Sequence, residues 1–294
     1  MKQINNLNNP DIESQEYLLT VDKLTKKYGH KTVVDNISFK LKKGEVVGII
    51  GKNGAGKTTL VEMIIGIKDP TSGKIIRSYG NTKKEISQLS GIQFQDNTYP
   101  DRIKVKDLIY FYRDVYSGNQ FIKDRLNELI DSFNLREHMD SYAKRLSGGQ
   151  QQRLNILLAV IHNPKLLVLD ELSTGLDIQQ KQRIKNFIKS LIVENNWTVI
   201  MVSHNMEELE ELCDRLLVIE DGKIVYDLTV KEVEEKYQTV YNFIDKYFTY
   251  ITEIEDKKNR ELKEKADSER KLSDTISKEL SFFKKIFKRN KKIN

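Results

Sequence analysis

The chain has almost no cysteine, little proline and no long hydrophobic run. Cys213 is the only cysteine among 294 residues, which excludes an intrachain disulfide and a cysteine-based metal cluster and favours a reducing compartment. No stretch approaches 18 consecutive apolar residues, so we expect no membrane-crossing helix. The polar, Asn-rich opening at 1–16 lacks the apolar core of a secretory signal. With only four prolines, the domains are not joined by Pro-rich linkers.

Positive charge is concentrated at one end of the chain. The net charge is +6, but residues 257–294 hold 14 Lys and Arg against 6 Asp and Glu, so 1–256 is close to neutral. An argument for nucleic-acid binding from charge therefore concerns the last 38 residues only. The hydrophobic content of 38% is enough for a packed core and excludes a disordered or fibrous chain.

Hydrophobic patterning predicts an α/β chain. Short apolar runs around a turn at Tyr28-Gly29-His30 predict a small β layer at 17–41, and 216–226 has the pattern of a β-hairpin. Fully apolar runs at 166–169 and 199–202, separated by a polar amphipathic helix, are typical of a parallel sheet with crossover helices. Helical periodicity then predicts a mainly helical segment between them and the first strands, at 105–116, 120–133 and 149–161.

A glycine-rich loop follows the short apolar run at 45–50. Residues 51–58 match G-x-x-x-x-G-K-[ST] between a strand and a helix. In such a loop the backbone N–H groups point inward at a helix N-terminus, where the helix dipole favours anions. We expect Lys57 to reach the β- and γ-phosphates of a bound triphosphate and the Thr58 hydroxyl to bind Mg²⁺. The residues expected to bind the phosphates are Asn53, Gly54, Ala55, Gly56, Lys57, Thr58 and Thr59.

The apolar run at 166–169 ends in two adjacent carboxylates, Asp170 and Glu171. Parallel strands end at the ligand edge of a sheet, so Asp170 can face Mg²⁺ and Glu171 can deprotonate an attacking water. An apolar run ending in Asp-Glu is common by itself, and a purely structural strand end is the alternative. The glycine loop on the same chain favours the catalytic interpretation.

The stretch Leu146-Ser147-Gly148-Gly149-Gln150 completes a set of motifs that resembles the ATP-binding-cassette (ABC) ATPases, over about 17–227. The resemblance implies a P-loop NTPase core with an antiparallel β subdomain and a helical signature subdomain at about 96–160. We therefore expect a polar leader at 1–16, a nucleotide-binding domain at 17–228, and a C-terminal helical extension at 229–294.

The resemblance also implies roles for residues outside the phosphate loop. Tyr28 matches an aromatic residue that stacks on adenine, although it could instead pack in the small sheet. Gln95 matches the loop glutamine that contacts Mg²⁺ and the attacking water, with Gln93 as the alternative. Asp177 matches the D-loop, and His204 matches the switch histidine that contacts the γ-phosphate. The catalytic set implied is Glu171, His204 and Gln95, and the metal ligands implied are Thr58, Gln95 and Asp170.

One position departs from the family pattern. Leu172 stands where proline usually follows the catalytic glutamate. The sequence therefore leaves the rigidity of this turn open, although the glutamate itself is present.

The signature predicts a second anion site, at the helix N-terminus formed by Ser147, Gly148, Gly149 and Gln150. The sequence contains one phosphate loop, which leaves this second site without one of its own. In the family, the signature of one cassette closes on the γ-phosphate held by another. We therefore expect two ATP sites across the interface of a head-to-tail dimer, with a homodimer as the first expectation.

The family powers transporters but also includes soluble translation factors and chromosome and repair ATPases. The chromosome and repair class has a very long coiled coil between phosphate loop and signature, whereas only 89 residues separate Lys57 from Leu146. The translation factors generally carry two cassettes in one chain. We therefore expect a transporter ATPase subunit at the cytoplasmic face of the membrane, with a separate transmembrane permease subunit. The alternative is a soluble ABC ATPase that acts on the ribosome or nucleic acid through its basic tail.

Two segments are candidates for partner contacts. The first, 96–116, is similar to export-type bacterial cassettes and could dock the permease, although about half of its apolar residues could be core; import is the alternative direction. Its apolar members are Tyr99, Ile103, Tyr110, Phe111 and Tyr116.

The second segment lies beyond a capping box at Thr229 and Glu232, which predicts an amphipathic helix. Its apolar stripe is Val240, Ile244, Tyr247, Ile251 and Ile254. In the basic tail, Ile276, Leu280, Phe283 and Phe287 have helical spacing and could place the tail on an anionic membrane surface. A solvated basic end is the alternative, and nucleic acid is the least favoured partner.

Overall fold

The structure is a computed structural model that describes residues 16–93, 99–116, 118, 120–172, 176–254, 256, 257, 260–265 and 269. The chain divides into two compact units, 1–240 and 241–294, and each is described by itself. The elements that position the proposed site all belong to the first unit.

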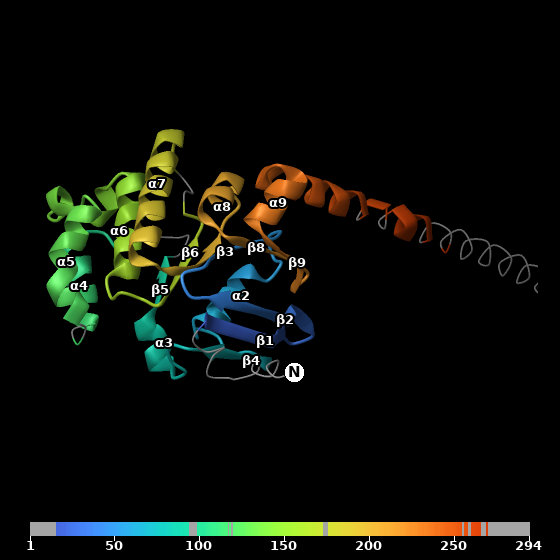
Figure 1. The fold of residues 1–294 in the computed structure, drawn as a ribbon, viewed down its shortest axis with the longest axis horizontal. Coiled ribbons are helices and arrows are strands. Elements are labelled where there is room, and N and C mark those ends of the chain that lie inside the picture. Colours follow the sequence, from blue (N-terminus) through green and yellow to red (C-terminus); the bar gives the residue numbers. More distant parts are fainter. Residues whose placement is uncertain are drawn as a thin grey trace, which may run out of the picture. The chain divides into compact units, whose positions relative to one another are not determined.

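The first unit contains a six-stranded sheet with the strand order β5-β6-β7-β3-β8-β9 (Figure 1). Its strands are β3 (Val46–Ile50), β5 (Ser90–Gln93), β6 (Leu166–Asp170), β7 (Thr198–Val202), β8 (Arg215–Glu220) and β9 (Lys223–Thr229). Neighbouring strands are parallel except β8 and β9, which form a hairpin. Every residue of β3 and β7 is buried, as expected for strands covered on both faces. The predicted parallel strands and hairpin are confirmed.

A second, antiparallel sheet has the order β2-β1-β4. It consists of β1 (Tyr17–Tyr28), β2 (Lys31–Lys42) and β4 (Ser72–Arg77). The predicted turn after Tyr28 joins β1 to β2 and is confirmed. Strand β4 was not predicted, because it is mostly exposed and has only two apolar residues, Ile75 and Ile76.

Helices cover the six-stranded sheet on both faces (Figure 1). Helix α2 lies between the two sheets, whereas α6, α7 and α8 lie on the opposite face, with α4 and α5 beside α6. The helices predicted before Thr229 are confirmed, but the short helices α3 and α8 were missed. The helices are α2 (Lys57–Ile64), α3 (Lys83–Leu89), α4 (Val105–Val115), α5 (Gln120–Ser132), α6 (Gly148–Val160), α7 (Ile178–Asn195), α8 (Met206–Leu212) and α9 (Val230–Tyr237), with 3₁₀ turns at Arg136–His138 and Ala143–Arg145.

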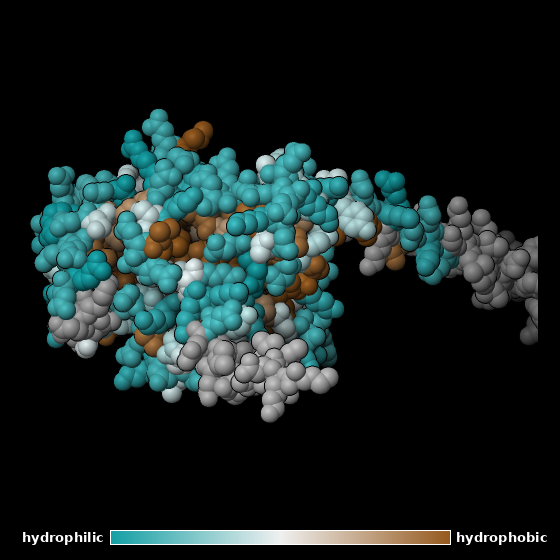
Figure 2. Space-filling view, in the orientation of Figure 1, coloured by the Kyte–Doolittle hydropathy of each residue, from teal (hydrophilic) through white to brown (hydrophobic). Residues whose placement is uncertain are grey.

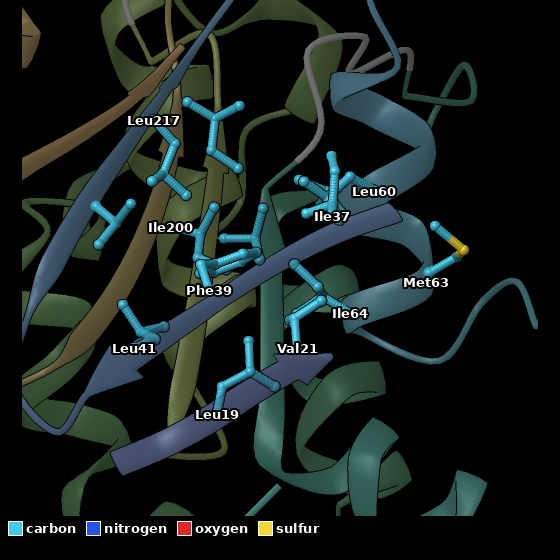
Figure 3. Close-up of a cluster of buried hydrophobic side chains, with 14 of the residues drawn as sticks. Leu19, Val21, Ile37, Phe39, Leu41, Leu60, Met63, Ile64, Ile200 and Leu217 are labelled. Atoms are coloured by element: carbon cyan, nitrogen blue, oxygen red, sulfur yellow. The ribbon is translucent and has the colours of Figure 1, made fainter. Parts of the chain in front are cut away.

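The main core lies between the two sheets and includes one side of α2 (Figure 3). The face drawn in Figure 2 is mainly hydrophilic, with apolar side chains visible chiefly at the level of the six-stranded sheet. This packing holds the N-terminus of α2 against the carboxyl end of β3. The labelled core residues are Leu19 and Val21 of β1, Ile37, Phe39 and Leu41 of β2, Leu60, Met63 and Ile64 of α2, Ile200 of β7 and Leu217 of β8.

The amphipathic helix expected to run from Thr229 through Ile254 is interrupted. The predicted capping box at Thr229 is present, but α9 ends at Tyr237 and Gln238 adopts a left-handed φ of 72°. A second helical segment spans 240–254. Its first N–H, at Val240, donates to Glu210 Oε2 of α8 at 3.0 Å, which gives this segment a start of its own. The prediction of one continuous helix was therefore wrong.

Among the described residues, the longest and most apolar helices still fall short of what a membrane span requires. The apolar residues of the basic tail, Ile276, Leu280, Phe283 and Phe287, lie outside the described residues.

Candidate functional site

The glycine loop at 51–56 joins the carboxyl end of β3 to the N-terminus of α2. Gly56 has a left-handed φ of 102°, and a Cβ there would lie 2.4 Å from the Val33 carbonyl oxygen. At Gly51 a Cβ would lie 2.3 Å from the Ile219 carbonyl oxygen. Larger residues would clash at both positions. In the described structure α2 has no side-chain cap and no acidic residue in its first turn, so its N-terminal N–H groups can bind an anion.

Two other segments of the chain hold this loop through backbone hydrogen bonds. The Gly222 N–H, in the β8–β9 turn, donates to the Ala55 carbonyl oxygen at 3.1 Å, and the Asp35 N–H donates to the Gly222 carbonyl oxygen at 2.8 Å. Ala55 and Gly56 are buried. Of the other residues predicted to bind phosphate, Asn53, Gly54 and Thr58 are exposed and Thr59 is half-buried.

Lys57 connects the loop to the pair of carboxylates. Its buried ammonium group donates to the carbonyl oxygens of Gly51 at 2.7 Å and Lys52 at 3.2 Å. Burial lowers the pKa of this ammonium group, whereas the negative charges of Asp170 and Glu171 act in the opposite direction. The loop and the carboxylates therefore belong to one site.

Asp170 and Glu171 lie at the carboxyl end of β6. Burial, with a further contribution from the Glu171 charge, raises the pKa of Asp170, and Lys57 opposes that shift. Glu171 has a left-handed φ of 53°, and its N–H donates to the Val202 carbonyl oxygen at 2.8 Å. Leu172 is fully buried. Packing and this hydrogen bond therefore hold the turn that lacks the family proline.

His204 follows the neighbouring strand, β7. The strands β6 and β7 are parallel, and Asp170 pairs with Val202 at their carboxyl ends. His204 is exposed at the same edge of the sheet. The structure therefore brings Lys57, Asp170, Glu171 and His204 to one edge, as the motif order predicts.

The signature starts α6 with a capping box. Ser147 Oγ accepts a hydrogen bond from the Gln150 N–H at 3.4 Å, and Gln150 Oε1 accepts one from the Ser147 N–H at 2.9 Å. Ser147 and Gly148 are exposed. A pocket of about 210 Å³ lies beside this helix start and includes two arginines that sequence reasoning missed. Its lining residues are Ser147, Gly149, Gln150, Arg153, Gln180, Arg183 and Ile184.

Comparison with known proteins decides the family. A family model described as ABC transporter matches residues 34–174. The ABC transporter ATP-binding protein NatA of Bacillus subtilis (strain 168) is 36% identical over 198 residues, which cover 66% of this chain and 80% of NatA. The chain belongs to the ABC transporter ATP-binding family. This cassette is therefore an ATPase.

The relatives that match the cassette include proteins named for import and proteins named for export. The methionine import ATP-binding protein MetN of Geobacillus kaustophilus (strain HTA426) is 33% identical over 220 residues, or 71% of this chain. The match spans 64% of MetN, which is less than two thirds of its length. The Nod factor export ATP-binding protein I of Paraburkholderia xenovorans (strain LB400) is 37% identical over 215 residues, covering 71% of this chain and 69% of that protein.

Solved structures confirm the P-loop NTPase fold of the cassette. CbiO1 from Clostridium perfringens, part of the ABC transporter complex cbiONQ, matches with a TM-score of 0.66 and 26% identity, covering 81% of this chain and 97% of that chain. A dimeric post-hydrolysis state of the cassette MJ0796, bound to ADP and Pi, matches with a TM-score of 0.62 and 25% identity, covering 72% and 98%.

Two further residues expected in the site, Tyr28 and Asp177, lie in the described part of the chain. The Tyr28 ring is 46% exposed rather than packed in the small sheet, and the Lys26 ammonium nitrogen lies 5.3 Å from its centroid. Asp177 caps α7, because its Oδ1 accepts a hydrogen bond from the Gln180 N–H at 2.8 Å. The spacing of Asp177 and Gln180 before an amphipathic helix is a capping signal that sequence reasoning could have used.

Gln93 and Gln95 are the two candidates for the loop glutamine. Gln93 ends β5 and is 2% exposed, so its side chain is enclosed by protein. Gln95 lies outside the described residues, as do Ser173, Thr174 and Gly175 of the D-loop. The burial of Gln93 favours Gln95, whose role stays a prediction.

Proposed function

We propose that two copies of this cassette form a head-to-tail dimer that binds two MgATP and drives a separate transmembrane permease. The observation that carries the proposal is the start of α6, an exposed helix N-terminus with two glycines beside a pocket that contains Arg153 and Arg183. These groups suit a phosphate, but the sequence has only the phosphate loop at 51–58, which already begins α2. A second chain would supply the phosphate for this signature.

Binding of ATP would use the glycine loop and the N-terminus of α2. The N–H groups of 53–59 would receive the phosphates, and Lys57 would exchange its loop carbonyl partners for the β- and γ-phosphates. The exposed Tyr28 ring could stack on adenine. The signature residues Ser147 to Gln150 of the other copy, followed by Asp177 at the start of α7, would close on the γ-phosphate.

The residues present also fit a magnesium ion. Asp170 and Glu171 are adjacent, half-buried carboxylates whose mutual repulsion a cation would relieve. Hydroxyl, carboxylate and amide oxygens are ligands that Mg²⁺ accepts, so Thr58, Asp170 and Gln95 would hold it. The ion would neutralise charge on the β- and γ-phosphates.

Hydrolysis would use the residues at the ends of β6 and β7. Glu171 would take a proton from the water that attacks the γ-phosphorus, and the bond to the ADP oxygen would break. His204 would donate a hydrogen bond to a γ-phosphate oxygen and stabilise the charge that develops there.

The permease is proposed to dock on the exposed face of α4. Phe111 is 62% exposed, and Tyr110 and Val115 are also exposed. In contrast, the Tyr99 hydroxyl donates to Asn155 Oδ1, and the Tyr116 ring stacks on His162. Ile103 is half-buried. The exposed side chains of α4 are available to a partner, whereas Tyr99 and Tyr116 hold the helical segment together.

We propose export as the direction, supported by the export-type character of 96–116 and by the Nod factor export relative, although MetN is an import protein. The cassette would lie at the cytoplasmic face of the membrane, with its basic tail on anionic lipid. The alternative, action on the ribosome or nucleic acid, would use the same tail.

The substitution Glu171→Gln tests the proposed ATPase dimer. Loss of the base should lower turnover by about a hundredfold or more and leave ATP bound, so the dimer should persist in MgATP. Turnover and light scattering after size exclusion measure the two effects. The matched control Glu194→Gln, on the exposed side of α7, should turn over like the parent and remain monomeric after turnover. Parental turnover of Glu171→Gln would show that another group is the base.

A further inference from the structure

A buried hydroxyl group closes the turn that carries His204. Ser203 follows β7 and is 2% exposed, whereas His204 is exposed. Ser203 Oγ donates a hydrogen bond to Glu208 Oε2 at 2.7 Å and accepts one from the Asn205 N–H at 3.0 Å. One hydroxyl group therefore fixes the residues immediately before and after His204.

Glu208 is an unusual partner for this hydroxyl group. Its side chain lies in α8 and is 2% exposed. Within the described part of the chain, Glu208 Oε1 is buried and has no hydrogen-bond partner. Burial of a carboxyl oxygen without a partner costs free energy, and an apolar side chain would avoid that cost. The hydrogen bond from Ser203 is the interaction of the Glu208 carboxyl group that offsets this cost.

Helix α8 does not need this bond for its start. Asn205 is the N-cap residue, and its Oδ1 accepts a hydrogen bond from the Glu207 N–H at 3.0 Å. The cap and the Ser203–Glu208 bond are thus separate interactions. Loss of the Ser203 hydroxyl would leave the cap in place and release only the turn around His204.

We infer that Ser203 and Glu208 are positioning residues that hold His204 at the ligand edge of the sheet. This inference rests on the proposed role of His204 at the γ-phosphate. Ser203 and Glu208 are enclosed behind the turn, so they act on the reaction through His204. Their loss should therefore lower the rate of hydrolysis and leave the affinity for ATP nearly unchanged.

Paired substitutions in the full chain test the inference. Ser203→Ala removes the donor and Glu208→Met removes the acceptor, whereas Glu208→Gln keeps an oxygen acceptor. We expect the first two to lower kcat about tenfold and Glu208→Gln to stay within about threefold of the parent. Affinity for a fluorescent ATP analogue should change less than about twofold in all three. The double variant Ser203→Ala/Glu208→Met should be no slower than the slower single variant, because both remove one shared interaction.

A matched control and a spectroscopic signal separate positioning from a general loss of structure. Ser190→Ala removes an exposed hydroxyl group that donates to the Phe187 carbonyl oxygen within α7, and should keep the parental kcat. The chain has four histidines, so histidine-labelled protein gives few ring signals by NMR. Ser203→Ala should shift the His204 signals, while those of His30 and His138 stay in place.

The outcomes distinguish this inference from the proposed function. If His204→Ala is inactive and Ser203→Ala matches the parent in kcat and in the His204 signals, the positioning role is overturned and the role of His204 stands. If His204→Ala keeps parental turnover, the histidine has no part in hydrolysis, and both its proposed role and the positioning inference fail.

Discussion

Glu171 holds a backbone conformation that residues other than glycine adopt rarely. Its φ of 53° costs about 1 kcal/mol and persists only where neighbouring interactions enforce it. Here its N–H bonds to the end of β7 and Leu172 is buried directly after it. The strain lies at the carboxylate proposed to act as the base. Such placement is typical of catalytic residues that are held in position before the substrate arrives.

His162 is a second residue whose surroundings have a measurable consequence. The ring is buried and stacks on Tyr116 with a centroid separation of 4.3 Å, and its Nε2 lies 3.1 Å from the Ser90 carbonyl oxygen. Burial lowers the pKa of His162 to about 4, although the bond to Ser90 acts in the opposite direction. The folded protein therefore favours the neutral ring.

The stability of the fold should consequently fall as the pH drops from 6.5 to 4. The unfolded chain protonates His162 near the ordinary pKa of 6.5, whereas the folded chain does so only near 4. In that window the unfolded state binds more protons, so acid favours unfolding by up to about 3 kcal/mol. Urea unfolding of His162→Gln should show a correspondingly weaker pH dependence. The exposed His30→Gln should keep the parental dependence, and equal slopes for all three proteins would contradict the assignment.

At the scale of elements, β4 has a role that its sequence does not reveal. Arg77, at its end, donates from Nε and Nη2 to the Ile64 carbonyl oxygen at 2.9 and 2.8 Å, and from Nη2 to the Met63 carbonyl oxygen at 3.0 Å. These carbonyl groups lie at the end of α2, where carbonyl groups lack partners within the helix, although the Met63 carbonyl oxygen also accepts a hydrogen bond from the Gly66 N–H at 3.2 Å. The strand therefore stabilises the helix that carries the phosphate loop.

Arg77→Met should lower the free energy of unfolding by about 2 kcal/mol, because it removes charged donors from buried carbonyl groups. Lys74→Met on the same strand is the matched control. Its exposed ion pair with Asp22, at 3.7 Å, should contribute less than about 0.5 kcal/mol. Urea denaturation measures both values, and equal losses would show that the end of α2 does not depend on Arg77.

The elements that sequence patterning found are those with a strong local signal. The strands β3, β6 and β7 are apolar runs, and α4 and α7 have clear periodicity. The missed elements β4, β5, α3 and α8 have only four to seven residues, and β4 is tied to α2 through its own Arg77, a contact that the sequence does not display. The break at Gln238 was missed for the same reason, because Glu210 of α8 starts the following helix.

At the scale of the whole molecule, the motif residues could be predicted because their spacing is a property of the chain. Lys57, Asp170, Glu171 and His204 meet at one edge because β3, β6 and β7 are parallel neighbours. Arg153, Arg183 and the Ser203–Glu208 pair have no such spacing. Their positions follow from how helices pack, which a single sequence does not display.

Co-purification tests whether the whole molecule works with a permease. The tagged chain, expressed in its own host and extracted in mild detergent, should bring a stoichiometric, strongly hydrophobic subunit. Phe111→Asp should lose that subunit and keep basal ATP turnover, whereas Val193→Asp, at an exposed apolar site on α7, should retain it. Recovery of ribosomes or nucleic acid in place of such a subunit would support the soluble alternative.

The short helix α8 joins two parts of the chain that the sequence separates. At about 10 Å long, it begins directly after the turn of His204, and its Glu210 accepts the N–H of Val240, the last residue of the first unit. The start of the segment that begins at Val240 is therefore anchored to the helix that follows the His204 turn.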